Sequence, residues 1–306
     1  MLQHVKTIFF ISSFCRPSLQ ITIGSTTTAF SRLEINHFQN RLYTNRNKNN
    51  NDMMSDSTKN NATTANIIRQ QKQLLRKQIR SRVRSVYPSP SSSSTSDNNN
   101  DIEKINASKL KLTTQSNQVF HQLFQLSQYQ SASTIGFFLS MPHGEIQTRD
   151  AIQRMVGQDG KTLYVPRVGL DFELCDMDLV RCDISSTTTF DASSSSSRLF
   201  YDNWPTNKWG IPEPPSSNTN IATPGDIDLL IVPGLAFDCN LHRLGQGKGY
   251  YDRFIAKMKN GETDADKKKL LLVGVCLDEQ FLEEESIPVS DHDFIMDMVL
   301  TPSKKL

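Results

Sequence analysis

A glycine-spaced loop between an apolar run and a helical pattern is the stretch of this sequence best suited to bind an anion. The apolar run, residues 228–233, is typical of a buried strand, and the helical pattern starts at Tyr250. The loop between them contains Gly245, Gly247 and Gly249. Glycine lets the backbone curl around a ligand, a helix N-terminus presents unpaired N–H groups, and Lys248 adds a positive charge. This combination favours a phosphate chain as the ligand.

The loop matches neither of the two common nucleotide-binding motifs. A P-loop requires glycine six residues before its lysine and a hydroxyl residue after it, but His242 and Gly249 stand at those positions. The glycines of the loop stand at every second position, which also differs from the dinucleotide fingerprint G-x-G-x-x-G. The sequence therefore indicates a different phosphate-binding loop, with a glycine-rich turn beside an exposed lysine as the alternative.

Acidic residues near the loop suggest a magnesium site. Asp252 lies in the first helical turn after the loop, where it either caps the helix or holds an Mg²⁺ ion that bridges phosphates. Asp291, Asp293 or Asp297 near the C-terminus could supply a second carboxylate, or could lie solvated in a loop. Magnesium sites commonly use only one or two carboxylates, so this set is sufficient.

A helix is expected over residues 67–86. The apolar residues of one face are Ile68, Leu75, Ile79, Val83 and Val86. Lys72 and Arg76 are four residues apart and flank this stripe, so they could point into a cleft beside the docked helix. Other cations of the helix, such as Lys77 and Arg80, are expected to face water.

The remaining pattern alternates between strands and helices and predicts a parallel sheet covered by helices. The expected strands are residues 134–139, 162–168, 171–182, 228–233, 270–277 and 293–300. The expected helices after the first are residues 112–124, 145–156, 250–258 and a short one at 279–285. The proline-rich segment around Trp209 is expected to be a stiff loop.

The N-terminal segment, residues 1–64, differs in composition from the rest. Residues 1–33 contain no Asp or Glu and are rich in hydroxyl residues, which is typical of a transit peptide, although an extension without a targeting role is the alternative. We expect residues 1–64 to be a transit-peptide-like, disordered extension and residues 65–306 to be a single catalytic domain. Disordered low-complexity inserts are expected near residues 88–101, 185–198, 215–225 and 259–269. Location in the mitochondrial matrix is predicted, with a cytoplasmic form as the alternative.

Composition excludes several classes of function. The chain has 34 Lys and Arg against 32 Asp and Glu, a net charge of +2, so no general affinity for nucleic acid is expected. The five cysteines form no C-x-x-C pair, which argues against a zinc site or a disulfide framework. No apolar run approaches the roughly 20 residues that span a bilayer, so no membrane partner is expected.

Together these residues resemble the 5-formyltetrahydrofolate cyclo-ligase family, also called methenyltetrahydrofolate synthetases. The resemblance covers about residues 72–301 and rests on separate blocks in the family's order. These are Lys72-Gln-Leu-Leu-Arg76, Phe138-Leu-Ser-Met141 leading to Glu145-Ile-Gln-Thr148, Trp209-Gly-Ile-Pro-Glu-Pro214, Arg243-Leu-Gly-Gln-Gly-Lys-Gly-Tyr-Tyr-Asp252, and the acidic segment around Asp293.

The resemblance implies an α/β fold with a three-layer, open, mostly parallel sheet and helices on both faces, of the Rossmann-like kind. It implies an ATP- and Mg²⁺-dependent conversion of 5-formyltetrahydrofolate to 5,10-methenyltetrahydrofolate, with release of ADP and phosphate. The partner is then a small reduced folate, and we expect a monomer. The alternatives are a non-catalytic folate- or nucleotide-binding protein, and a kinase or isomerase for another phosphate-bearing substrate. Trp209 and Glu145 argue against the latter, because a sugar phosphate gains little from a flat aromatic wall.

By resemblance, Lys248 and Arg243 are the catalytic residues and Asp252 and Asp293 hold Mg²⁺. The residues expected to bind ATP are Lys72, Arg76, Arg243, Leu244, Gly245, Gln246, Gly247, Lys248, Gly249, Tyr250 and Tyr251. Those expected to bind the folate are Leu139, Glu145, Trp209, Gln246, Gly247, Lys248, Gly249 and Tyr250. The chain departs from some relatives at Gln246, where they have arginine.

Overall fold

The computed structural model describes residues 19–23, 26–30, 56–88, 99–168, 176–182, 199–259, 269–284 and 286–306. The chain divides into two units, Met1–Ala65 and Asn66–Leu306, which are treated separately below. The expected insert at 185–198 and most of those at 88–101 and 259–269 lie outside the described residues, as does most of the transit-peptide-like segment.

The first unit contains regular structure where only a disordered extension was expected. Strand β1 (Leu19–Ile23) pairs antiparallel with β2 (Thr26–Phe30), with Leu19 opposite Phe30. Both segments are rich in Thr and Ile, whose branched side chains favour strands. Helix α2 (Asp56–Val86) begins in this unit, ahead of the expected start at residue 67, and continues into the second.

A six-stranded sheet forms the centre of the second unit. Its strands, in spatial order, are β11 (Met298–Leu300), β9 (Leu271–Val275), β6 (Leu229–Pro233), β3 (Thr134–Gly136), β4 (Thr162–Val168) and β5 (Met177–Arg181). All neighbouring pairs are parallel except β4 and β5. The sheet is therefore mostly parallel, with an antiparallel edge strand.

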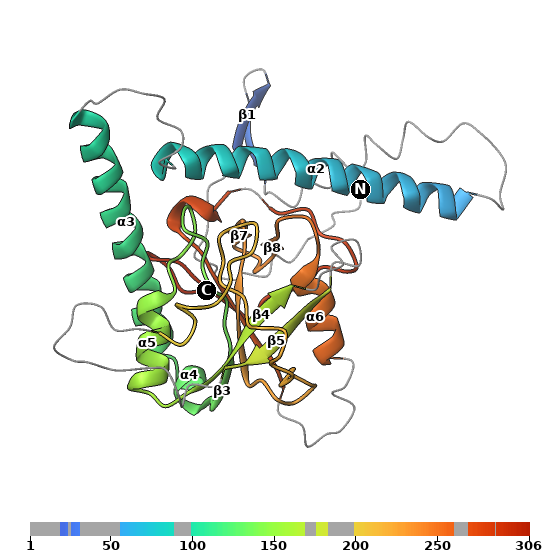
Figure 1. Cartoon of the computed structure of the whole chain (residues 1–306). Helices are drawn as coiled ribbons and strands as arrows, with labels where there is room; N and C mark the ends of the chain where they lie inside the picture. The colour runs from blue at the N-terminus through green and yellow to red at the C-terminus, as the bar shows by residue number, and fades with distance from the viewer. Residues whose placement is uncertain are drawn as a thin grey trace. The chain divides into compact units, whose positions relative to one another are not determined.

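Helices cover both faces of this sheet, so the predicted three-layer α/β architecture is confirmed (Figure 1). Side chains alternate along β6: Leu229 and Ile231 join one core cluster, and Leu230 and Val232 join the other. The first cluster contains residues of α3 (Asn99–Phe124), α4 (Ser127–Ser131) and α5 (Arg149–Gly157). The second contains residues of α6 (Tyr250–Lys259). The branched residues of each parallel strand are thus buried on both sides.

A small second sheet carries the start of the glycine loop. It has the order β10 (Phe281–Leu282), β7 (Ala236–Asp238) and β8 (Arg243–Leu244). A 3₁₀ helix, η2 (Asp278–Gln280), precedes β10. The buried Gln280 side chain donates hydrogen bonds to the carbonyl oxygens of Gly234 and Leu235, 3.2 and 3.3 Å away. This anchors the backbone that follows β6.

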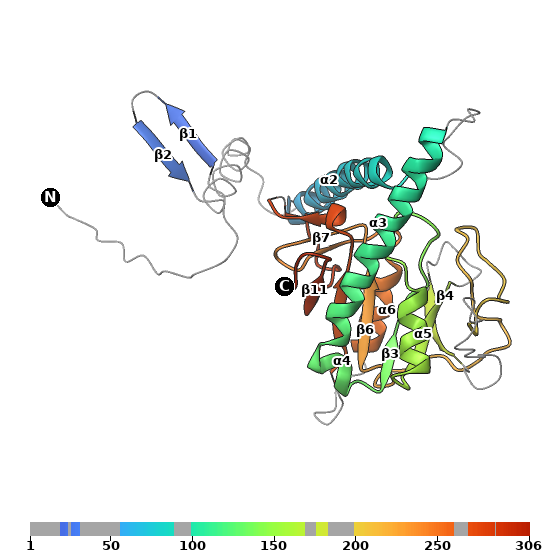
Figure 2. The ribbon, with the colours of Figure 1, turned by 90° about the vertical axis from the view of Figure 1, so that its left-hand side faces the viewer.

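Within the second unit, α2 lies across one end of the main sheet (Figures 1 and 2). It buries the predicted apolar face and Tyr87 just beyond its end: the buried residues are Leu75, Ile79, Val83 and Tyr87. Glu279 of η2 fixes the C-terminal end of the helix, because its carboxylate accepts hydrogen bonds from Tyr87 Oη at 3.1 Å and from Lys111 Nζ and Gln115 Nε2 of α3. One carboxylate therefore joins three segments.

Glu279→Ala is expected to lower the free energy of unfolding by roughly 2 kcal/mol, because the buried Tyr87 and Gln115 lose their acceptor. Burial raises the pKa of Glu279, but hydrogen bonds from Lys111, the backbone and Gln115 together hold it below its usual value. A depressed folded-state pKa stabilises the native state above the ordinary pKa, and this contribution is lost as pH falls through the folded value. Thermal unfolding at pH 7 should therefore distinguish the variant from wild type more strongly than at pH 3. Equal unfolding temperatures at pH 7 would contradict this role.

Several expected elements differ from those observed, among them the helix expected at 112–124, which begins at Asn99, and the strand expected at 293–300, which begins at Met298. Three further differences have a clear physical reason. The helix expected from residue 145 begins at Arg149, because the backbone before it loops around Glu145. The helix expected over 279–285 is reduced to η2, and Phe281 and Leu282 pair with β7 instead. The linker expected at 215–225 packs on the fold: Ile221 bridges Val180 of β5, and Ala222 is buried. Pairing with an edge strand overrode the polar composition of this last segment.

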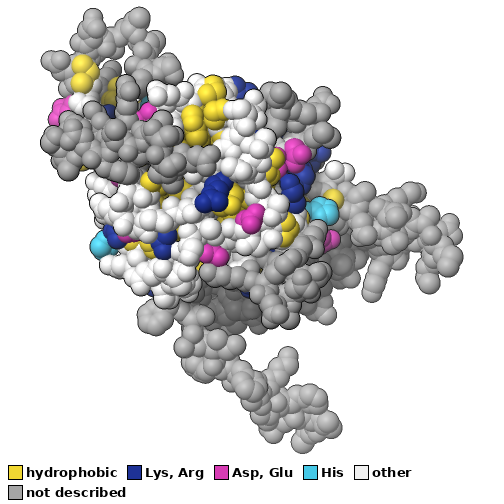
Figure 3. Space-filling model, turned by 60° about the horizontal axis from the view of Figure 1, so that its bottom comes forward, with side chains coloured by type: hydrophobic (Ala, Val, Ile, Leu, Met, Phe, Trp, Pro, Cys, Tyr) yellow, Lys and Arg dark blue, Asp and Glu magenta, His cyan; other side chains and the backbone are white. Residues whose placement is uncertain are grey.

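Charged side chains of both signs lie on the described surface (Figure 3). On the face shown in Figure 3, Lys and Arg side chains lie interspersed with Asp and Glu. None of the helices in the described ranges has the length and apolar character needed to cross a membrane.

Candidate active site

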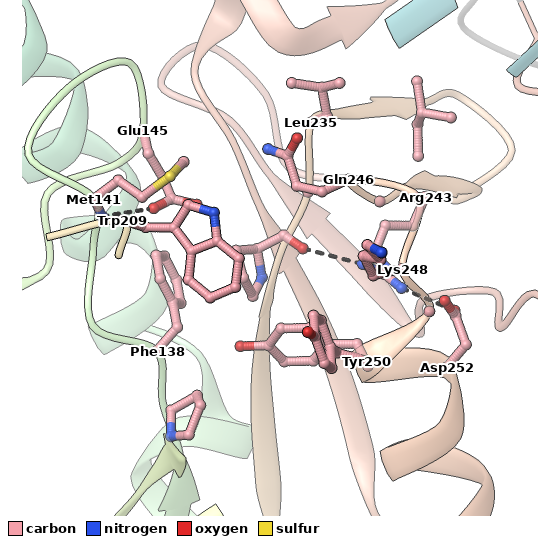
Figure 4. Close-up of a pocket in the computed structure, with 18 of the residues that line it drawn as sticks. Phe138, Met141, Glu145, Trp209, Leu235, Arg243, Gln246, Lys248, Tyr250 and Asp252 are labelled. Carbon is pink, nitrogen blue, oxygen red and sulfur yellow. Dashed lines mark hydrogen bonds and ion pairs between the residues drawn. The ribbon is translucent and has the colours of Figure 1, made fainter. Parts of the chain in front are cut away.

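A cleft of about 1310 Å³ lies where the parallel strands β3 and β6 end. Ligand sites of open α/β sheets commonly lie outside the carboxyl ends of their strands. Segments far apart in the sequence form its walls: α2, the loop after β3, the segment around Trp209, the glycine loop and residues 291–294. The close-up in Figure 4 shows Glu145 and Trp209 on one side and Lys248 and Asp252 on the other.

Two positions of the glycine loop need glycine for its backbone. Gly247 has φ +104° and Gly249 has φ +71°, in the region that side chains disfavour. The loop also lies close to two arginines: a Cβ on Gly247 would be 3.3 Å from Arg76 Cζ, and one on Gly245 would be 3.1 Å from Arg243 Nη1. The absence of side chains thus gives the curved loop the space to pack beneath two guanidinium groups.

Arg243 is a buried cation at the base of this loop. Its Nη2 donates to Asp252 Oδ1 at 2.8 Å, and the guanidinium lies 5.5 Å from the ring centre of Tyr251. Its Nη1 approaches the carbonyl oxygen of Pro233, at 3.4 Å, and its buried Nε has no hydrogen-bond acceptor among the described residues. Asp252 is therefore the ion-pair partner of Arg243.

Lys72 and Asp293 form a second ion pair in the cleft. Asp293 Oδ2 also accepts hydrogen bonds from Ser290 N, at 2.6 Å, and from Ser290 Oγ, at 2.8 Å. Burial raises the pKa of Asp293, but the hydrogen bonds from Lys72 and Ser290 hold it below its usual value. The carboxylate is therefore charged near neutral pH.

Among the further cations of the cleft, Arg76, Arg80 and Lys248 lie at or beside the glycine loop and have no carboxylate partner in the described part of the chain. Arg76 Nε donates to the carbonyl oxygen of Gly245, at 2.8 Å, and Arg80 Nη2 donates to Gln246 Oε1, at 2.8 Å. Burial, followed by the charge of Arg80, lowers the pKa of Arg76. Positive charges that repel one another around a glycine loop are suited to bind a polyanion such as a nucleotide phosphate chain.

Glu145 belongs to the other half of the cleft. Its Oε2 accepts a hydrogen bond from Met141 N, at 2.9 Å, which closes the loop after β3 into a turn, with Gly144 at φ +70°. Burial raises the pKa of Glu145 to about 7, and the bond from Met141 only partly offsets this. A carboxylate in such a place suits a ligand that brings its own N–H donors.

Aromatic and apolar side chains surround Glu145. Phe138, Met141, Trp209 and Tyr250 all line this part of the cleft (Figure 4). Burial raises the pKa of Tyr251, with a further increase from the charge of Glu145 and an opposing effect of Arg243. Tyr251 therefore lies between the carboxylate half and the cationic half of the cleft.

Every residue predicted from the sequence to bind ATP, the folate or the metal lines this one cleft. Asp291 also lines it, but Asp297 accepts a hydrogen bond from Leu272 N of β9, at 2.9 Å, so its role is in the sheet. The sequence reasoning missed Arg80, which was expected to face water. Its spacing of four residues from Arg76 was the signal that could have identified it.

Asp252 and Asp293 are compatible with Mg²⁺ only as partners of a phosphate ligand. No group of three or more metal-ligating side chains occurs among the described residues. Each carboxylate has one oxygen in its ion pair, and the other, Asp252 Oδ2 or Asp293 Oδ1, accepts no hydrogen bond from the described residues. Because Mg²⁺ typically takes one or two carboxylates together with phosphate oxygens and water, the donor set fits.

Comparison with known proteins assigns this arrangement to one family. Residues 68–302 match the model of the 5-formyltetrahydrofolate cyclo-ligase family. A probable 5-formyltetrahydrofolate cyclo-ligase of Schizosaccharomyces pombe is 31% identical over 195 residues, covering 63% of this chain and 86% of the relative. The mitochondrial 5-formyltetrahydrofolate cyclo-ligase of Arabidopsis thaliana is 43% identical over 77 residues, covering 25% of this chain and 28% of the relative.

The fold agrees with this assignment. The structure of Aquifex aeolicus 5,10-methenyltetrahydrofolate synthetase has a TM-score of 0.51 at 22% identity, covering 76% of this chain and 91% of that one. The family model spans the helix that carries Lys72, the loop that carries Lys248 and the segment that carries Asp293. The chain therefore belongs to the 5-formyltetrahydrofolate cyclo-ligase family.

Proposed function

We propose that this protein is an enzyme that converts 5-formyltetrahydrofolate and ATP into 5,10-methenyltetrahydrofolate, ADP and phosphate, with Mg²⁺. The observation that carries the proposal is that one cleft joins a cationic glycine loop to an aromatic pocket that contains the half-buried carboxylate of Glu145. The first half suits a nucleotide and the second suits a flat ring with N–H donors. A ligase that couples ATP to a folate needs both in contact.

The chemistry explains why both halves of the cleft are needed. The formyl oxygen is a weak nucleophile and the formyl carbon a weak electrophile, so the oxygen first takes the γ-phosphoryl group of ATP. N10 then attacks the activated carbon, and phosphate leaves. Transfer of a phosphoryl group depends mainly on position and on neutralising charge, for which Lys248, Arg76 and Arg243 are placed around the loop.

Asp252 and Asp293 would hold Mg²⁺, directly or through water. When bound, the ion neutralises negative charge on the phosphate oxygens. In the structure, Arg243 pairs with Asp252 and Lys72 pairs with Asp293. These ion pairs position both carboxylates in the cleft.

On the folate side, Glu145 would accept hydrogen bonds from the amino and ring N–H groups of the pterin. Trp209 and Tyr250 line the same space and offer flat faces for stacking, with Leu139 beside them. Fixing the ring by one edge orients N5 and N10 relative to the glycine loop. That orientation is what ring closure requires.

A turnover assay with the purified full-length chain tests the proposal. Methenyl product should form only when 5-formyltetrahydrofolate, ATP and Mg²⁺ are all present, with one ADP released per product. Product without nucleotide would contradict the mechanism. Binding of both ligands without ADP release would identify a non-catalytic binding protein instead.

We further propose a mitochondrial location, supported by the acid-poor composition of residues 1–33 and by the mitochondrial relative from Arabidopsis thaliana. A fluorescent protein fused after residue 64 should enter mitochondria only when residues 1–33 are present. Cytoplasmic fluorescence from the longer fusion would support the alternative location. We also propose a monomer, which the mass of the purified protein in solution will test.

A further inference from the structure

Four basic side chains of α2 lie one helical turn apart along one wall of the cleft. They are Lys72, Arg76, Arg80 and Arg84. A spacing of four residues keeps side chains on the same helix face, with an advance of about 6 Å along the axis for each. Each cation therefore faces a different part of the cleft.

The contacts of α2 show where Arg80 lies along this wall. Arg76, one turn earlier, bonds the glycine loop at Gly245. Val83, one turn later, lies against the loop after β3, since a Cβ on Gly144 would be 3.1 Å from Val83 Cγ1. Arg80 thus occupies the span between the glycine loop and the loop that carries Glu145.

Gln246 holds the Arg80 guanidinium in that position. The bond from Nη2 to Oε1 is 2.8 Å long and lies at an exposed part of the cleft. Figure 4 shows Gln246 between Glu145 on one side and Lys248 on the other. An amide orients a guanidinium without neutralising it, so the other N–H groups of Arg80 and its full charge remain for a ligand.

We propose that Arg80, oriented by Gln246, binds a carboxylate of the glutamate tail of the folate, and that Arg84 extends this site along the exit of the cleft. The inference rests on the proposed folate substrate. A reduced folate carries its carboxylates at the end remote from the pterin, so a ring beside Glu145 and Trp209 directs them toward the mouth. A guanidinium presents paired N–H donors that match a carboxylate.

A comparison of two ligands tests this assignment. Calorimetry with the full-length protein would measure binding of 5-formyltetrahydrofolate and of the carboxamide of 5-formyltetrahydropteroate, which lacks the glutamate and carries no carboxylate. Arg80→Ala should weaken binding of the first about tenfold, the size of one charge-assisted hydrogen bond, and leave the second unchanged. Lys77→Ala, which removes an exposed cation of the same helix outside the cleft, should change neither.

The role of Gln246 gives a second variant. Gln246→Glu should pair with Arg80 and repel the tail, so it should also weaken binding of the glutamyl ligand only. An equal loss for both ligands in Arg80→Ala would overturn the proposal. So would an unchanged folate affinity with a raised KM for ATP, which would assign Arg80 to the nucleotide. These binding measurements are independent of turnover, so absence of methenyl product from the wild type would contradict the proposed function without deciding this one.

Discussion

Lys248→Ala is expected to reduce kcat by roughly 100- to 1000-fold, the cost of removing one preorganised charge from a reacting centre. Lys248 is exposed in the free protein and follows Gly247 in the loop, which lies against Arg76. It has no ion-pair partner among the described residues, so its charge is available to a phosphate. Because the Lys248 charge acts on the reacting phosphate and does not stabilise the fold, the unfolding temperature of the variant should equal that of the wild type.

The measurement is the initial rate of methenyl formation at saturating ATP and folate, together with thermal unfolding of each variant. Lys248→Arg keeps the positive charge but should recover only part of the rate, because a planar guanidinium places this charge at a different point from the lysine ammonium. Lys109→Ala, an exposed lysine of α3 outside the cleft, serves as the control. A folded Lys248→Ala protein with wild-type kcat would refute the catalytic role of this lysine.

The sequence identified residues that line the cleft better than it identified the ion pairs between them, for a physical reason. The glycine spacing around Lys248 and the apolar helix face that Lys72 and Arg76 flank are local patterns. Such patterns can be read from neighbouring residues without knowledge of the tertiary fold. The pairing of Lys72 with Asp293 joins residues 221 positions apart. Only the assembled sheet brings such groups together, so the sequence offered Asp291, Asp293 and Asp297 as equal candidates.

The errors follow the same rule. Arg80 was expected to face water, because a run of cations on a helix is usually solvated. Its orientation toward the cleft is instead set by the way α2 packs on Glu279 and the core. The first turn of the helix expected from residue 145 is replaced by a loop, because the Glu145 side chain bonds the backbone of Met141 and the helix begins only at Arg149. In both cases a tertiary contact overrode a local preference.

Glu145→Gln is expected to lower kcat/KM about 100-fold while it stabilises the protein in weakly alkaline solution. Glutamine keeps the shape but replaces one of two acceptor oxygens with an amide donor, which opposes the N–H groups of the pterin. Loss of a buried charged hydrogen bond to substrate costs roughly 1.5–3 kcal/mol, and an opposed donor adds to it. The wild-type pH profile should rise near pH 7 as this carboxyl group ionises, and the glutamine variant should lack that rise.

The stability effect has a definite sign. Burial raises the pKa of Glu145 from 4.5 to about 7, so between these values the native state binds more protons than the unfolded state. Native stability therefore falls as pH rises through this window, by at most about 3 kcal/mol. Glutamine does not ionise and escapes this loss.

Thermal unfolding at pH 5 and at pH 8 measures the difference. The glutamine variant should exceed wild type at pH 8 by several degrees and differ less at pH 5, where the wild-type carboxyl group is largely protonated when folded. Thr148→Ser, which trims a neighbouring buried side chain, controls for general effects on this loop. A difference from wild type that is the same at both pH values would show that Glu145 is not held in an environment that opposes its charge. An ionised Glu145 could then accept hydrogen bonds from the substrate without lowering the free energy of unfolding.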